Sequence, residues 1–197
     1  MATPQHDYQL LMSQALNPDD IATVAFAGVI SMRATRQKPY DTPIAGLNDY
    51  SILSIKRCFF PGAPIESITP LPLAQCHELE DEFGDLLELL MEHRTVPDET
   101  STWLSHAIAT ASMSSNHLWQ DMGLPSRAML SQLMSQYFTS LAGRNTGDMK
   151  WKKFFYRELC ERAGLSVCRS PSCGVCSDYS NCFGPEEATS GHLLITA

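Results

Sequence analysis

The chain has 197 residues, of which 44% are hydrophobic and 18% charged. These proportions are usual for a soluble globular protein and give no sign of disorder along the whole chain. The length suits one domain, or one domain with a short appendage. The net charge of −8 and the pI near 5.1 argue against a nucleic-acid binder, because such proteins carry a strong excess of Lys and Arg.

The N-terminal region shows no export signal. The first twenty residues contain no Lys or Arg, so the cationic start of a signal peptide is missing. The longest mostly apolar run, residues 21–30, is far too short to cross a bilayer. We therefore expect a cytoplasmic protein with no membrane partner. Its seven cysteines are then thiols or metal ligands instead of disulfides.

Hydrophobic residues recur at helical spacing along most of the chain, and no stretch shows convincing β-strand alternation. We expect helices over residues 18–36, 47–60, 73–94, about 98–114, 126–142 and about 148–163. The first opens at Asn17-Pro18, an N-cap followed by proline, and the second ends before Pro61-Gly62. The third has leucines on one face and carboxylates on the other.

The later helices have clear ends. Acidic residues after Pro97 suit the positive N-terminal end of a helix dipole. The apolar stripe that starts at Leu130 is the most regular in the chain and stops at Gly143, while the last helix ends at Gly164. The sequence thus predicts an all-α fold, with an irregular helical bundle over residues 1–164, a cysteine-rich metal-binding loop packed on it at 165–187, and a flexible tail at 188–197.

Four cysteines near the C-terminus carry the main chemical signal. They are Cys168, Cys173, Cys176 and Cys182, with the spacing C-x4-C-x2-C-x5-C. Four soft thiolates within fifteen residues can converge on one metal centre. Prolines and glycines between and after them permit tight turns, and these leave backbone N–H groups free to face the sulfurs of a cluster.

The spacing alone leaves the identity of the metal open. Structural zinc sites usually have two short knuckles, and here only Cys173 and Cys176 form one. The x4-then-x2 order matches the start of a plant-type ferredoxin set, although the fourth ligand there lies much farther along the chain. Iron–sulfur ligation is the first interpretation, zinc the second, and disulfides or redox thiols the third.

Several stretches of the chain resemble the NifQ family of nitrogen-fixation proteins. They are Gly123 to Arg127, Arg144-Asn145, Met149 to Tyr156, Leu159 to Glu161 and the whole segment from Cys168 to Glu187. The stretch His117 to Asp121 and the helix Leu79 to Arg94 are similar as well. The family's cysteine pattern is met at all four positions, and the resemblance spans roughly residues 79–187.

The resemblance implies a role in processing molybdenum for the iron–molybdenum cofactor of nitrogenase. It implies a molybdenum–iron–sulfur (Mo-Fe-S) cluster on the four cysteines, with molybdate as a source of molybdenum. The implied recipients are the nitrogenase iron protein (NifH) and the cofactor scaffold (NifEN). In this role the chain is a carrier and not an enzyme in the ordinary sense. Two alternatives are a zinc-stapled helical interaction module and a simple iron–sulfur electron carrier.

Residues outside the cysteine set are weaker candidates. His117 is the candidate histidine ligand to molybdenum, and its alternative is a supporting or capping role. Lys150, Lys153 and Arg157 form a basic stripe that is either a solvated helix face or a surface for molybdate, an anionic cluster or an acidic partner. The remaining cysteines are expected to be packed thiols, namely Cys58, Cys76 and Cys160.

Overall fold

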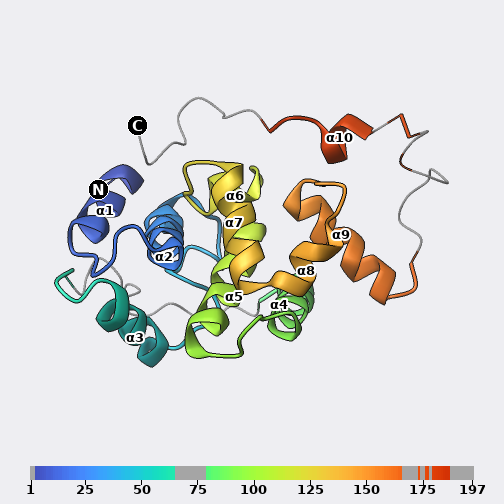
Figure 1. The fold of residues 1–197 in the computed structure, drawn as a ribbon. Helices are drawn as coiled ribbons and strands as arrows, with labels where there is room; N and C mark the ends of the chain where they lie inside the picture. The colour runs from blue at the N-terminus through green and yellow to red at the C-terminus, as the bar shows by residue number, and fades with distance from the viewer. Residues whose placement is uncertain (1–2, 65–78, 166–172, 174–175, 178, 187–197) are drawn as a thin grey trace.

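The computed structural model of the chain describes residues 3–64, 79–165, 173, 176–177 and 179–186 (Figure 1). All regular structure in these residues is helical, which confirms the all-α prediction for this part of the chain. In chain order the elements are α1 (Pro4–Ser13), α2 (Ile21–Ser31), the 3-10 helix η1 (Met32–Thr35), α3 (Asp49–Phe59), α4 (Asp81–Glu92), α5 (Glu99–Ser112), α6 (Leu118–Asp121), α7 (Arg127–Tyr137), α8 (Thr139–Arg144), α9 (Trp151–Arg162) and α10 (Tyr179–Phe183).

Helix α2 is the centre of the fold. Every one of its residues is buried, and α1, α5 and α7 pack around it (Figure 1). A helix that is apolar on all sides has to be enclosed by other elements, which is what happens here. Gly28 lies so close to the carbonyl of Met122 that an added Cβ would stand 2.2 Å from that oxygen. A residue without a side chain therefore allows α2 to meet the end of α6.

Most of the longer helices begin at a residue whose side chain caps the first turn. This side chain accepts a hydrogen bond from the backbone amide three residues later, which satisfies a donor that the helix itself leaves unpaired. The capping residues are Thr3, Asp20, Asn48, Asp98 and Ser126. The expected N-cap at Asn17 is wrong, because Asp20 is the residue that caps α2.

The helix expected over residues 126–142 is two helices, α7 and α8, separated at Phe138. The backbone of Phe138 leaves the helical conformation (φ −137°, ψ 49°), and its side chain is buried. Thr95 stabilises the break, since its amide donates to the carbonyl of Tyr137 (2.8 Å) and its hydroxyl accepts from the amide of Thr139 (2.9 Å). Helix α8 then continues past Gly143, which was the expected end.

Three short helices escape the sequence pattern, namely α1, α6 and α10. Each is too short or too weakly patterned to show a long apolar stripe. Helix α4 begins at Asp81, and residues 73–78 of the helix expected there lie outside the described residues. Within the part of the chain that the structure describes, no helix has the length and apolar character needed to span a membrane.

The contact between Gly28 and Met122 can be tested by adding a single methyl group. Gly28→Ala should lower the free energy of unfolding by about 1–3 kcal/mol, because overpacking forces the two backbones apart. Gly84→Ala is the matched control: its Cβ meets nothing within 4 Å on the exposed side of α4. It should raise stability by about 0.5–1 kcal/mol. Urea denaturation followed by circular dichroism measures both, and equal effects would contradict the close packing.

His106 makes the stability of the fold depend on pH. Its Nδ1 lies 3.0 Å from the carbonyl oxygen of Ala45. Burial lowers the pKa of His106 from the usual 6.5, and the hydrogen bond to Ala45 opposes this only in part. The folded protein therefore binds a proton at His106 less readily than the unfolded chain does.

Stability should consequently fall as the pH drops below about 6.5, because the unfolded chain takes up this proton first. His106→Gln, which stays neutral, should reduce the difference in free energy of unfolding between about pH 7.5 and pH 5.5. Burial also lowers the pKa of His93, but that contribution is present in both proteins. An equally large drop in the variant and the wild type would contradict this role of His106.

Candidate functional site

Three of the four predicted cysteine ligands lie in the described residues. Cys173 is exposed, and Cys176 and Cys182 are half-buried, the last of them within α10. The amide of Cys176 donates to the carbonyl of Cys173 (3.3 Å), so the two residues of the x2 pair close one tight turn. Cys168 lies outside the described residues.

The described cysteines are all free thiols, namely Cys58, Cys160, Cys173, Cys176 and Cys182. No three His, Cys, Asp or Glu side chains among the described residues are grouped so that they could hold a metal ion. Since Cys168 is not among these residues, convergence of the four cysteines stays a prediction. Cys160 is half-buried, but Cys58 is exposed, so the expectation of a packed thiol is wrong there; Cys76 lies outside the described residues.

The described end of the cysteine segment docks on the turn that precedes α9. The amide of Lys150 donates to the carbonyl of Cys182 (2.8 Å), and its ammonium group donates to the carbonyl of Ser180 (3.3 Å). The ring of Phe183 lies against Gly147, where an added Cβ would stand 3.2 Å from it. The backbone of Cys182 is therefore fixed to the start of α9, with a positive charge beside α10.

A buried carboxylate fixes the same segment a few residues later. The side chain of Glu186 is only 4% exposed, and its Oε1 lies 3.7 Å from Nε of Arg127 and 3.8 Å from Nδ1 of His117. The guanidinium of Arg127 also binds both carboxylate oxygens of Asp148 (2.9 and 3.0 Å). We call His117, Arg127, Asp148 and Glu186 the anchor cluster. It ties the cysteine segment to α6, to α7 and to the turn before α9.

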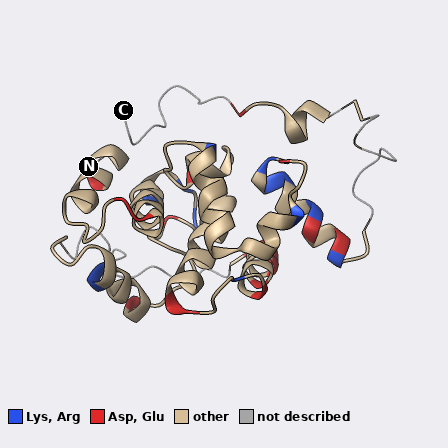
Figure 2. Ribbon diagram, viewed as in Figure 1, with Lys and Arg blue, Asp and Glu red and all other residues tan. Residues whose placement is uncertain are grey.

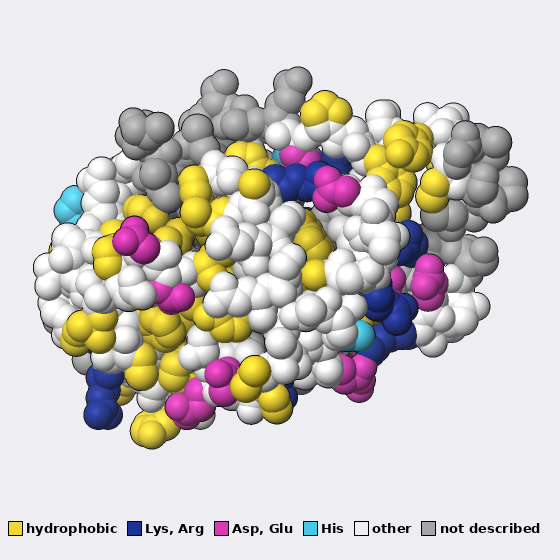
Figure 3. Space-filling view, viewed as in Figure 1, with side chains coloured by type: hydrophobic (Ala, Val, Ile, Leu, Met, Phe, Trp, Pro, Cys, Tyr) yellow, Lys and Arg dark blue, Asp and Glu magenta, His cyan; other side chains and the backbone are white. Residues whose placement is uncertain are grey.

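His117 occupies the N-cap position of α6 and donates its backbone amide to Oε1 of Gln120 (3.2 Å). The structure thus places this candidate ligand at a helix start, with one ring nitrogen toward Glu186. Figure 3 shows basic and acidic side chains gathered at the upper edge of the molecule, above α6 and α7.

A second ion pair lies close to the anchor cluster. Nζ of Lys152 is 2.6 Å from Oδ2 of Asp121 and 2.6 Å from the carbonyl of Ser114. Burial lowers the pKa of Lys152, and the charges of Asp121 and Glu186 oppose this shift. The charge of Asp121 also acts on buried Arg36, whose pKa burial lowers to about 10. Asp121 is therefore the counter-ion of Lys152, and its charge also acts on Arg36.

Figure 2 shows basic and acidic positions along α9. The three residues of the predicted basic stripe differ in their surroundings. Lys150 binds α10, as described above, and Lys153 is exposed. Arg157 lies over the ring of Phe154 (5.5 Å to the centroid) and pairs with carboxylates of α9 at 3.5 Å. The charge of Lys153 thus faces solvent, whereas Lys150 and Arg157 are engaged with groups of the protein. Use of the stripe by an anion or partner stays a prediction.

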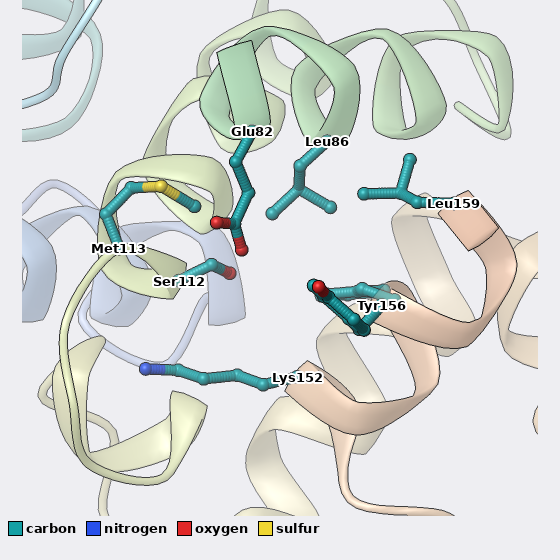
Figure 4. A pocket seen from close by; sticks show the side chains of 8 residues that line it. Glu82, Leu86, Ser112, Met113, Lys152, Tyr156 and Leu159 are labelled. Carbon is teal, nitrogen blue, oxygen red and sulfur yellow. The ribbon is translucent and has the colours of Figure 1, made fainter. Parts of the chain in front are cut away.

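A pocket of about 40 Å³ lies between α4, the end of α5 and α9 (Figure 4). Glu82 points into it, while the chain of Lys152 passes along it toward Asp121. The residues that line it are Glu82, Leu86, Ser112, Met113, Lys152, Phe155, Tyr156 and Leu159. The volume suits about one water molecule and is too small for a metal cluster. We therefore assign this pocket no role in function.

Comparison with known proteins decides the family. The NifQ family model matches residues 25–184. Protein NifQ of Azotobacter vinelandii is 40% identical over 151 residues, which cover 72% of this chain and 77% of that protein. The chain belongs to the NifQ family. Membership in NifQ, a family of nitrogen-fixation proteins, indicates a role in nitrogen fixation.

Other NifQ proteins show the same relationship. A NifQ homolog of Sinorhizobium fredii is 37% identical over 149 residues, which cover 76% of this chain and 64% of that protein. Protein NifQ of Rhodobacter capsulatus is 35% identical over 142 residues, which cover 72% of this chain and 76% of that protein. No solved structure matches the chain.

Separate NifQ-like stretches meet in the anchor cluster and the neighbouring ion pair. His117 and Asp121 come from one stretch, Arg127 from the next, Lys152 from a third and Glu186 from the cysteine segment. Among these residues, only His117 has a role predicted from the sequence. The other residues could have been found from one signal: charged residues of both signs occur inside the NifQ-like stretches.

The pair of Asp121 and Lys152 should be strongly coupled. Asp121→Asn is expected to lower the free energy of unfolding by about 2–3 kcal/mol, because it leaves a mostly buried ammonium group without its counter-ion. Lys152→Met should also destabilise, while the double variant should lose about 1–3 kcal/mol less than the sum of the two. Urea denaturation of all four proteins measures this coupling. Simple additivity would contradict the ion pair.

Proposed function

We propose that this NifQ-family chain carries a molybdenum–iron–sulfur species on Cys168, Cys173, Cys176 and Cys182, and donates molybdenum for synthesis of the iron–molybdenum cofactor of nitrogenase. The observation that carries the proposal is the four-cysteine pattern at the end of a chain that belongs to this family. The proposed recipients are the nitrogenase iron protein (NifH) and the cofactor scaffold (NifEN). The protein acts as a cytoplasmic carrier and not as a turnover catalyst.

The local geometry supports thiolate ligation. The Cys173–Cys176 turn has the short spacing that metal knuckles use, and both residues are free thiols. Cys182 is fixed through its carbonyl to Lys150, whose ammonium group lies beside α10. The positive charge of this ammonium group can offset the negative charge of a bound cluster.

The chemistry divides the ligands between two metals. Three thiolates are enough to hold three irons of an open cuboidal cluster, with the fourth corner left for molybdenum. The fourth thiolate or His117 then completes the molybdenum side. Since Nδ1 of His117 lies 3.8 Å from Glu186, ligation by this residue falls to Nε2. A carboxylate beside the other ring nitrogen is the usual arrangement for a metal-binding histidine.

Delivery of the cargo requires that the site can open at small cost. Cys173 is exposed, whereas Cys182 and Phe183 are half-buried and pack against the core. Opening the site at the exposed Cys173–Cys176 turn therefore breaks fewer buried contacts than release of α10 would. An exposed turn that carries ligands supports a donor over a purely structural metal site.

Metal analysis of protein purified without oxygen tests the proposal. The wild type should be brown and contain iron and molybdenum, and the molybdenum should leave on incubation with a nitrogenase cofactor-assembly acceptor. Cys176→Ala should lose both metals, since a cluster ligand is gone. Cys58→Ala is the matched control: it removes an exposed thiol that is far from the four cysteines in sequence, and it should keep both metals.

The possible outcomes separate the candidate functions. A colourless protein with bound zinc would identify a zinc-stapled interaction module. Iron without molybdenum, or molybdenum that no acceptor removes, would point to an electron carrier. Equal metal contents in the two cysteine variants would remove Cys176 from the site.

A further inference from the structure

We infer that Glu186 is a positioning residue for the cysteine ligands. Its buried carboxylate lies between Arg127 and His117 and fixes the end of the cysteine segment, and this attachment positions the thiolates for metal binding. This inference rests on the proposed function, since it concerns the same cysteines. It adds a residue that binds no metal and acts through the backbone of the segment.

The side chain of Glu186 is buried. A carboxylate that is 4% exposed is stable only where positive groups or hydrogen-bond donors surround it. Arg127 and His117 approach the same carboxylate oxygen, and the positive charge of Lys152 also acts on it. The attraction of these groups holds the carboxylate against the helical body.

Arg127, the partner of Glu186, is already oriented by other contacts. Two nitrogens of the Arg127 guanidinium bind the carboxylate of Asp148, and one of them also binds the carbonyl of Met149 (3.0 Å). The Asp148 backbone is in the left-handed region (φ 53°), which turns this residue toward Arg127. The remaining nitrogen, Nε, is buried, has no hydrogen bond among the described residues, and lies 3.7 Å from Glu186. It is therefore available to a carboxylate that moves slightly closer.

Glu186 is connected to a predicted ligand, Cys182, through a short stretch of backbone. Cys182 is bonded to Lys150, and the amide of Gly184 donates to the carbonyl of Ser180 (2.8 Å). An added Cβ on Gly184 would stand 2.4 Å from that carbonyl oxygen. Only a residue without a side chain therefore fits where the chain leaves α10. With Glu186 anchored four residues after Cys182, this ligand is held from both sides. Loss of the anchor removes one of the two attachments.

The test separates anchoring from metal binding. Glu186→Gln removes the charge at constant shape, and Arg127→Lys keeps the charge but loses the planar group that holds Asp148. Glu161→Gln is the matched control, because Glu161 is an exposed carboxylate (57%) that pairs with another arginine, Arg157. Circular dichroism should show the same helix content in all of them, since none of these side chains belongs to the apolar core.

Two measurements are made on each protein. Amide hydrogen exchange of the metal-free chain reports whether residues around Cys182 stay protected. Titration with Co²⁺, whose absorption shows thiolate ligation, reports how well the cysteines are placed. Glu186→Gln and Arg127→Lys should exchange faster and bind Co²⁺ about tenfold more weakly, which is the usual effect of losing a partner outside the ligand set. Glu161→Gln should match the wild type in both.

Three results would overturn the inference. Unchanged exchange in Glu186→Gln would mean that the carboxylate is no anchor. Faster exchange with unchanged Co²⁺ affinity would mean that the anchor does not position the ligands. If the wild type binds no Co²⁺ through its thiolates, the cysteines do not form a metal site. If the wild type binds Co²⁺ through its thiolates and yet never carries molybdenum, the proposed function fails while the role of Glu186 stands.

Discussion

The enclosure of α2 is the constraint on which the rest of the structure depends. A helix without a polar face is stable only when other helices cover it on all sides, and here α1, α5 and α7 do so. The backbone of α2 at Gly28 touches the residue that ends α6, namely Met122. His117 and Asp121 lie on this same short helix. The geometry of the apolar core therefore decides where two residues of the polar site stand.

The two halves of the chain are joined by buried charge as well as by packing. Arg36 follows η1 and donates to carbonyls at Val29 and Thr42, so it caps the end of α2 and holds the following loop. The charge of Asp121 acts on Arg36, and its carboxylate binds Lys152 of α9. If α6 or α9 were displaced, the buried charge of Asp121 or Lys152 would lose its partner. This loss is more costly than the loss of an apolar contact.

The predictable part of the fold is the part that local chemistry decides. Capping side chains such as Asp98 and Ser126 mark where helices begin, because each satisfies an amide of its own first turn. The break at Phe138 could not be predicted in this way. Its stabilising partner is Thr95, which is distant in sequence, and the apolar stripe continues across the break.

The same distinction holds for the site. The spacing of the cysteines shows in the sequence alone, because the ligands are close together in the chain. Glu186 is far in sequence from Arg127 and His117, and only the fold brings it to them. A glutamate next to a cysteine cluster looks like any solvated charge until its burial is known. The opposite mistake occurs at Cys58. Its apolar neighbours in the sequence predict a packed thiol, but they do not cover it in the structure.

The attachment of Cys182 to Lys150 has a consequence for the length of the cysteine segment. The segment leaves the C-terminal end of α9 and returns to its N-terminal end, a helix of 12 residues and therefore ~18 Å long. The residues between 165 and 182 can reach about 55 Å when extended. The distance along α9 is about one third of this reach. The positions of Leu165 and Cys182 therefore place no tight limit on the spacing of the cysteines between them.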